Sequence, residues 1–350
     1  MITAAVAVPS VNGAHIIKGR AEVGYSGIVN GEFVNVEELA GIVTTVIAEA
    51  MKNARIRVDK IYVGVPHRHT YCTVEQTGLH FEKPHKITRH DMQKMLNSVH
   101  HNSDDLLIQK NIVCYYVDGG HPLHDAVGLV CSDLTARVSI VVADSYFTEN
   151  VREVVAKDFK LEFLPSALAE AMYLIDEDTR DRTCTLISCG MFSTTVSVIS
   201  GDGLVSTNSF NMGRAHVVND VSIVLETDYN SASALLDKVI LSVKMNEHDN
   251  YELITTKRKL NFAAETVNDI IKARLEVIAE NITRLIRRTD PNLLTYPIYI
   301  TGGTTDTILG ARDFLEKAIA APITQCVCPF TKQNKPGQLS LASLINLAIN

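Results

Sequence analysis

The stretch Ile298-Tyr299-Ile300-Thr301-Gly302-Gly303-Thr304-Thr305 joins an apolar, β-rich run to two adjacent glycines and small hydroxyl residues. The run predicts a buried strand, and the residues after it predict a turn that opens a helix. Glycine lets the backbone approach a flat or charged ligand closely, and a helix N-terminus presents unpaired N–H groups. A tight turn in which glycine only permits a positive φ would have the same sequence, so both interpretations stay open.

A second small-residue turn lies in Leu186-Ile187-Ser188-Cys189-Gly190-Met191-Phe192-Ser193-Thr194-Thr195-Val196, between two β-rich runs. A phosphate-binding hairpin needs a carboxylate for the Mg²⁺-bound water and several glycines whose N–H groups surround phosphate oxygens. Here Ser188 stands at the carboxylate position, only Gly190 remains of a glycine run, and the Met and Phe after it would crowd a polyphosphate. Ser193 and Thr194 remain possible phosphate donors, and an ordinary hairpin is the alternative.

Two weaker patterns follow along the chain. In Asn211-Met212-Gly213-Arg214, Gly213 and Arg214 stand at a strand-to-helix junction, where such a pair either binds an anion or is a plain turn with a surface charge. On the helix predicted over 263–288, Lys272 precedes Glu276 by four residues, which favours a surface ion pair. The alternative for Lys272 is a place beside the sugar or base of a nucleotide.

Composition excludes several classes of protein. The net charge is −7 and no long run of Lys and Arg occurs, so we expect no nucleic-acid partner. Seven cysteines without a Cys-x-x-Cys pair argue against a disulfide framework or a structural zinc site, and the twelve histidines show no metal-binding spacing. No apolar stretch is long enough to span a bilayer and the N-terminus lacks a basic signal-peptide region, so a cytoplasmic protein without direct membrane insertion is expected.

The order of predicted elements indicates two α/β domains. The first is predicted over 1–182, built from 1–66 and 141–182 around an inserted α+β subdomain at 67–140. The second, over 183–350, repeats the opening plan of hairpin, crossing strand and helix. Expected elements include helices over 36–54, 231–243, 263–288 and 306–320, and a short strand over 72–74.

In their order, these parts resemble the actin-like ATPases, and in detail the FtsA family of bacterial cell-division proteins. The resemblance is carried by Ile61-Tyr62-Val63-Gly64-Val65-Pro66 before the insertion, Leu164-Pro165-Ser166-Ala167-Leu168-Ala169-Glu170-Ala171, the Ile270–Glu276 helix and Thr301-Gly302-Gly303. It covers nearly the whole chain. It implies the ribonuclease H-like α/β fold of actin, in which two related domains flank a nucleotide cleft.

The resemblance also implies a function. FtsA-like proteins bind ATP with Mg²⁺, polymerise through their subdomains, bind the tail of the tubulin-like protein FtsZ and attach it to the membrane. Carried over by position, Gly302 and Gly303 match the adenosine-binding turn, and Lys272 lies on the adenine-proximal helix. Gly190 and Ser193 match the second phosphate loop. The remaining candidates for the nucleotide site are Thr194 and Thr304, beside these matches, and the pair Gly213 and Arg214 described above.

Three departures modify these expectations. The family's opening strand, with its first phosphate loop, is absent: Met1–Val8 resembles the second strand, so Met1 is expected to be an internal start. The family's Asp-Ile-Gly-Gly-Gly-Thr appears as Ser188-Cys189-Gly190-Met191-Phe192-Ser193, which removes an anchor for Mg²⁺ and the attacking water. No amphipathic membrane helix follows the last apolar segment.

The sequence therefore predicts an FtsA-like adaptor that self-associates and binds an FtsZ-type partner, with weak or lost binding of ATP and Mg. Catalytic residues are not expected. The alternatives are an active ATPase of the same fold and a pilus-assembly or chaperone-like adaptor. The central expectation is that residues 188–195 and 301–305 face each other across a shared hollow.

Overall fold

The computed structural model describes residues 1–10, 15–25, 27–29, 32–101, 103–155, 159–246, 248–254, 259–327 and 338–349. The chain divides into two compact units. The first contains Met1–Arg182, Ile199–Thr207 and Gln338–Asn350, and the second contains Thr183–Val198 and Asn208–Gly337. The C-terminal segment thus belongs to the first unit, whereas the sequence placed it in the second domain.

The first unit opens with the antiparallel pair β1 (Ile2–Pro9) and β2 (His15–Val23), against which α1 (Val36–Ala54) packs. Helix α1 has the predicted bounds. It begins where the Asn35 side chain accepts a hydrogen bond from the Glu38 N–H, and it ends at Arg55 in the left-handed conformation. The turn predicted at Asn12-Gly13 lies outside the described residues.

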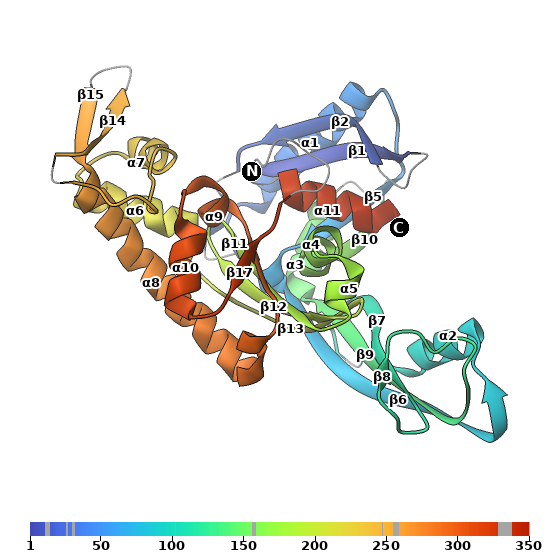
Figure 1. The fold of residues 1–350 in the computed structure, drawn as a ribbon. Helices are drawn as coiled ribbons and strands as arrows, with labels where there is room; N and C mark the ends of the chain where they lie inside the picture. Colours follow the sequence, from blue (N-terminus) through green and yellow to red (C-terminus); the bar gives the residue numbers. More distant parts are fainter. Residues whose placement is uncertain are drawn as a thin grey trace. The chain divides into compact units, whose positions relative to one another are not determined.

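The remainder of the core of this unit is built from the parallel pair β5 (Lys60–Val65) and β10 (Lys160–Pro165) with α3 (Ser145–Val154) and α4 (Ser166–Leu174). Helix α11 (Gln338–Ile349) packs on α4, as Figure 1 shows. The Ser340 hydroxyl donates to the buried Glu170 carboxylate over 2.7 Å, which ties α11 to this core. Small elements complete the unit: β3 (Ile28–Val29), β4 (Glu32–Phe33), η1 (His67–His69) and α5 (Glu177–Arg180).

The segment that the sequence indicated as an insertion forms a four-stranded antiparallel sheet with one helix. Strand order is β6 (Thr70–Lys86), β9 (Val130–Ala143), β7 (Leu106–Val117), β8 (Pro122–Leu123), and α2 (Arg89–Ser98) covers one face over a separate apolar core. A capping box between Thr88 and Asp91 starts α2, as the sequence suggested. The strand expected over 72–74 is far longer, because β6 pairs with β9 along nearly its whole length.

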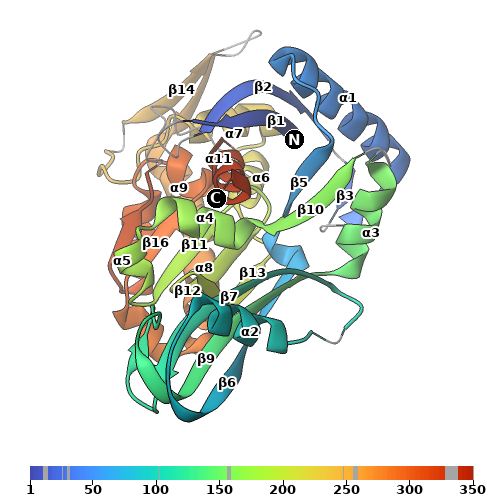
Figure 2. The ribbon, with the colours of Figure 1, turned by 90° about the vertical axis from the view of Figure 1, so that its right-hand side faces the viewer.

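A five-stranded sheet has the order β13 (Gly203–Phe210), β12 (Thr194–Ser200), β11 (Cys184–Cys189), β16 (Ile298–Thr301), β17 (Ile323–Gln325). Most of this sheet belongs to the second unit, while Ile199–Thr207, at the end of β12 and in β13, is grouped with the first. Its helices are α6 (Arg214–Val224), α7 (Tyr229–Leu236), α8 (Ala264–Thr289), α9 (Gly303–Thr307) and α10 (Ala311–Ile319), with η2 (Pro291–Thr295) after α8. Figure 2 gives a second view of these elements. The apolar stripe predicted on α8 is confirmed, because Val267, Ile271, Leu275, Ile278 and Ile282 are buried.

Three predictions for this unit need correction. The helix expected over 231–243 ends at Leu236. The helix expected over 306–320 is split into α9 and α10, because Gly310 adopts a φ of 87° and the Leu309 carbonyl accepts the Leu241 N–H. The hairpin β14 (Asn250–Ile254) and β15 (Lys259–Ala263) was not predicted, since each strand has only five residues.

Among the described residues, no helix is long and apolar enough to cross a membrane. The six cysteines that the structure describes carry free thiols. Cys326 is one of these and is buried, while Cys328 lies outside the described residues.

Candidate functional site

Two of the predicted turns end neighbouring strands of the second unit. Strands β11 and β16 are parallel, with Ile187 opposite Ile300 and Ser188 opposite Thr301. The carboxyl ends of parallel strands lie at one edge of a sheet, where α/β proteins bind ligands. The structure therefore brings segments 188–195 and 301–305 together at this edge.

The first turn is closed by its own backbone. The Gly190 N–H donates to the Ser193 carbonyl over 2.9 Å. The side chains of Met191 and Phe192 at its tip are exposed, Phe192 to 68%. These two side chains project from the turn into solvent, and the expectation that they would crowd a polyphosphate stays a prediction.

The start of helix α6 is bonded to the same turn. The N–H of Arg214 donates to the Gly190 carbonyl over 3.0 Å, and the N–H of Ala215 donates to the Met191 carbonyl over 2.8 Å. These are the first N–H groups of the helix. In an anion-binding site they would instead donate hydrogen bonds to the anion. The hairpin therefore occupies the position of an anion.

The hydroxyl groups proposed as donors also have partners within the protein. Thr194 Oγ1 donates to the Met212 carbonyl over 2.7 Å and is fully buried. Thr304 Oγ1 lies 3.5 Å from the Gly190 carbonyl oxygen, at the limit of a hydrogen bond, and is fully buried too. Ser193 contributes its carbonyl to the closed turn described above.

Two glycines allow close contact between three turns, which lie at 188–195, 211–214 and 301–305. A Cβ on Gly213 would overlap the Gly190 carbonyl oxygen and lie 2.9 Å from the Met191 carbonyl carbon. Gly302 has a φ of 109°, and a Cβ there would overlap the Cys189 carbonyl oxygen and lie 2.7 Å from its carbon. Backbone-to-backbone packing thus explains both glycines without a ligand, and the turns meet by direct contact.

The second glycine of the adenosine-type turn, Gly303, is the first residue of α9, and its carbonyl accepts a hydrogen bond from Thr307 Oγ1 over 2.6 Å. Cys189 lies beneath this turn and is fully buried. Burial raises the pKa of its thiol to about 12. The edge of the sheet is therefore dry and closely packed at this point.

Arg214 is buried and bonded on several sides. Its guanidinium donates to Thr307 Oγ1 over 3.0 Å, to Ser233 Oγ over 3.0 Å and to the Asp237 carboxylate over 2.7 Å. These contacts join α6 to α7 and α9, so the guanidinium has a structural role. The role of Asp237 was not predicted, because this residue lies inside the helix expected over 231–243.

Lys272 lies apart from the three turns on the half-exposed face of α8. Its ammonium is 4.0 Å from the Asp269 carboxylate, one turn earlier on the helix, instead of pairing with Glu276. Within the described parts of the chain, the ion-pair partner of Lys272 is Asp269 and not a residue of segments 188–195, 213–215 or 301–305. Arg274 on the same helix binds Asp220 of α6 through two hydrogen bonds of 2.5 and 2.9 Å.

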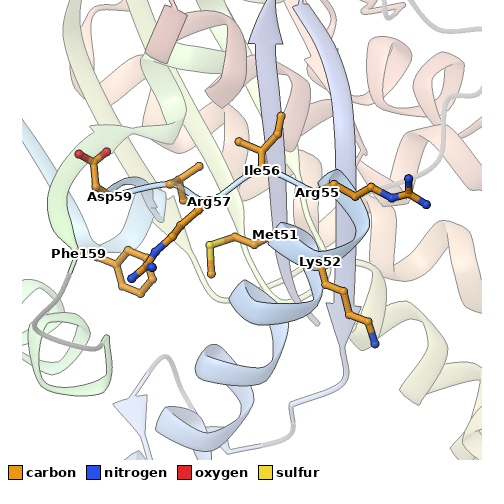
Figure 3. A pocket seen from close by; sticks show the side chains of 8 residues that line it. Met51, Lys52, Arg55, Ile56, Arg57, Asp59 and Phe159 are labelled. Atoms are coloured by element: carbon orange, nitrogen blue, oxygen red, sulfur yellow. The ribbon is translucent and has the colours of Figure 1, made fainter.

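A cavity of about 550 Å³ lies in the first unit, between the end of α1 and Phe159. Figure 3 shows Arg57 reaching to Phe159 beside Met51, whereas Lys52 and Arg55 point away from them. The three cations do not converge on one point, so the cavity does not form an anion site. It holds none of the residues predicted from the sequence.

Comparison with known proteins was made through sequence and through structure. No protein-family model matches the chain. Its sequence is 24% identical over 305 residues to the cell division protein FtsA of Streptococcus pneumoniae, covering 83% of this chain and 66% of that protein. It is 23% identical over 311 residues to FtsA of Enterococcus faecalis, covering 85% of this chain and 70% of that protein. The chain thus spans about two thirds of the length of these relatives.

Two solved structures are similar over almost the entire chain. The PilM-PilN type IV pilus biogenesis complex matches with a TM-score of 0.61 and 14% identity, over 99% of this chain and 94% of that one. The ethanolamine utilization protein EutJ from Carboxydothermus hydrogenoformans matches with a TM-score of 0.51 and 12% identity, over 98% and 86%. At these identities the likeness concerns the fold, which is the actin-like α/β fold expected from the sequence.

Proposed function

We propose that this chain is an FtsA-like adaptor of the cell-division or cytoskeletal machinery, with weak or lost binding and hydrolysis of ATP. It self-associates and binds a tubulin-like partner of the FtsZ type. Similarity to FtsA proteins over more than four fifths of the chain supports the division role. The proposed location is the cytoplasm, with recruitment to the inner membrane face or the division site through a partner.

The observation behind the loss of ATP binding is the closed phosphate side. The carbonyls of Gly190 and Met191 take the first N–H groups of α6, and Thr194 donates to Met212. A triphosphate would have to break these hydrogen bonds, each worth about 1 kcal/mol net, and separate backbones that are in contact. Ser188 moreover stands where a carboxylate would hold the water on Mg²⁺. These residues do not fit Mg-ATP.

We propose that the adenosine side of the site retains at most a weak affinity for nucleotide. Gly302, Gly303 and Thr304 form a turn at the strand ends, whereas Lys272, paired with Asp269 on α8, does not contribute to this turn. A nucleotide held by this side alone lacks the phosphate contacts that provide most of the polar recognition. Any remaining affinity is therefore expected to be weak and independent of Mg²⁺.

A surface for the tubulin-like partner is available where α6 joins α7. Ile223 is 66% exposed, Val224 58% and Tyr229 44%. The connection is tight, because the Glu226 N–H donates to the Ile223 carbonyl and the Thr227 N–H to the Ser222 carbonyl, so one short segment carries all three side chains. Exposed apolar clusters of this kind mark protein interaction sites, and aromatic residues often dominate them.

The test measures binding of a fluorescent FtsZ C-terminal peptide by anisotropy. Tyr229→Ser is expected to weaken binding about ten-fold or more, as loss of an aromatic anchor does. Tyr296→Ser is a matched control, because Tyr296 is 43% exposed but lies after η2, elsewhere in the unit. Failure of the unaltered chain to bind would refute the partner, and equal losses in both variants would refute the surface.

A pilus-assembly adaptor is the second candidate, favoured by the likeness to PilM over 99% of the chain. The same anisotropy measurement with a fluorescently labelled PilN-type protein distinguishes the two candidate functions. Binding of that protein in place of the FtsZ peptide would assign the chain to pilus assembly.

A further inference from the structure

The inserted subdomain has a long strand at its border. β6 pairs with β9 on one side, and in the described part of the chain no strand pairs with its other side. Figure 1 shows β6 as the outer strand of this sheet. An outer strand presents unpaired N–H and C=O groups to any strand that approaches it, so folded proteins usually protect such edges.

Only one half of β6 carries this protection. Near its end the pairing with β9 is interrupted between His80 and His85, and the interrupted part contains Lys83 and Pro84. Bulges, lysine and proline are the usual means of blocking an edge. The preceding segment, Thr73-Val74-Glu75-Gln76-Thr77-Gly78-Leu79, pairs with β9 without interruption, contains one charge and has no proline.

We propose that segment 73–79 of β6 pairs in antiparallel orientation with the same segment of a second copy of this chain. This inference rests on the proposed self-association and assigns its surface. A two-fold axis at Gln76 places Gln76 opposite its own copy and Glu75 opposite Thr77, so the whole segment pairs without opposed charges. An axis at Glu75 would set two carboxylates opposite each other, which is unfavourable.

The size of the contact determines its strength. Seven paired residues at ~3.4 Å each form an edge of about 24 Å. A single strand pair of this length buries less surface than a standard protein interface, so the association is weak and reversible. An extended segment of a different protein is the other occupant of such an edge, and it would leave the purified chain monomeric.

Variants that introduce a charge at Gln76, on the axis, test the proposal. Their self-association is measured by sedimentation velocity over a range of concentrations. Q76E sets two carboxylates opposite each other across the axis, and within the fold it faces Arg137 of β9, so the subdomain itself gains no like-charge pair. We expect Q76E to raise the dimer dissociation constant about five-fold. Q76K alone is also expected to weaken the dimer. Because it also sets a lysine opposite Arg137 of β9 within the fold, its folding is checked by thermal melting. An equimolar mixture of Q76E with folded Q76K is expected to restore the dimer.

The matched control is Q93E, which makes the same chemical change on an exposed residue of α2. It is expected to leave the dissociation constant unchanged. Association that Q76E does not alter, or that the mixture does not restore, would overturn the edge pairing while leaving self-association intact. A wild-type chain that stays monomeric at all concentrations would refute both the edge pairing and the proposed self-association.

Discussion

Replacement of Gly302 by alanine tests whether the turns at the sheet edge are closed by their own backbone. Gly302 has φ 109° and ψ 164°, a conformation that only glycine adopts without strain, which costs alanine about 1–3 kcal/mol. The new Cβ also overlaps the carbonyl of the buried Cys189 in β11, and a forced backbone shift costs about 1–3 kcal/mol more. We expect G302A to lose roughly 2–6 kcal/mol of unfolding free energy.

Urea unfolding followed by far-UV circular dichroism measures this loss. The expected decrease corresponds to a midpoint lower by roughly 1–3 M urea in the transition of the second unit. Gly41→Ala is the control, because a Cβ at this exposed position of α1 meets nothing within 4 Å. G41A is expected to stabilise α1 by about 1 kcal/mol. A G302A protein as stable as wild type would show that the turns do not pack as described.

Two further predictions concern buried polar groups. Arg214→Ala removes several hydrogen bonds of about 1 kcal/mol each that join three helices, whereas Asp237, which is 59% exposed, stays solvated. We therefore expect a loss of about 2–4 kcal/mol of unfolding free energy in urea, and a loss below about 1 kcal/mol would contradict this network. Hydrogen bonds from Thr88 and His85 lower the pKa of Asp91 to about 2. The carboxylate therefore contributes stability above its unfolded pKa near 3.8, and this contribution is lost as the pH falls from about 4 through 2. D91N is expected to remove that part of the pH dependence, and a wild-type slope in D91N would contradict it.

The sequence predicted the fold well where local signals agree with packing. Helix α1 has a side-chain cap, a regular apolar stripe and a left-handed end, and its predicted bounds are those of the structure. Strand β6 shows the opposite case. Its side chains are mostly polar and exposed, so no apolar alternation marks it beyond Val74, and its length is determined by the distant partner β9.

The sequence predicted strands that end in the turns at Gly190 and Gly302, and it expected these turns to face each other across a hollow. In the structure the two strands are adjacent and parallel, and the backbone of Cys189 lies directly against Gly302. The sequence cannot tell a glycine that admits a ligand from one that admits another backbone. That distinction depends on the contacts of Gly213 and Gly302 with residues 189–191, which no local pattern encodes.

The most direct measurement of the central claim is thermal melting of the chain with and without Mg-ATP. A ligand bound with a Kd of ~10 μM would stabilise the protein by about 2.7 kcal/mol at ~1 mM, which shifts Tm by several degrees. Because the protein's own carbonyls hold the N–H groups of α6, we predict that Tm does not change up to millimolar Mg-ATP. A rise of several degrees that requires both Mg²⁺ and the triphosphate would contradict the account.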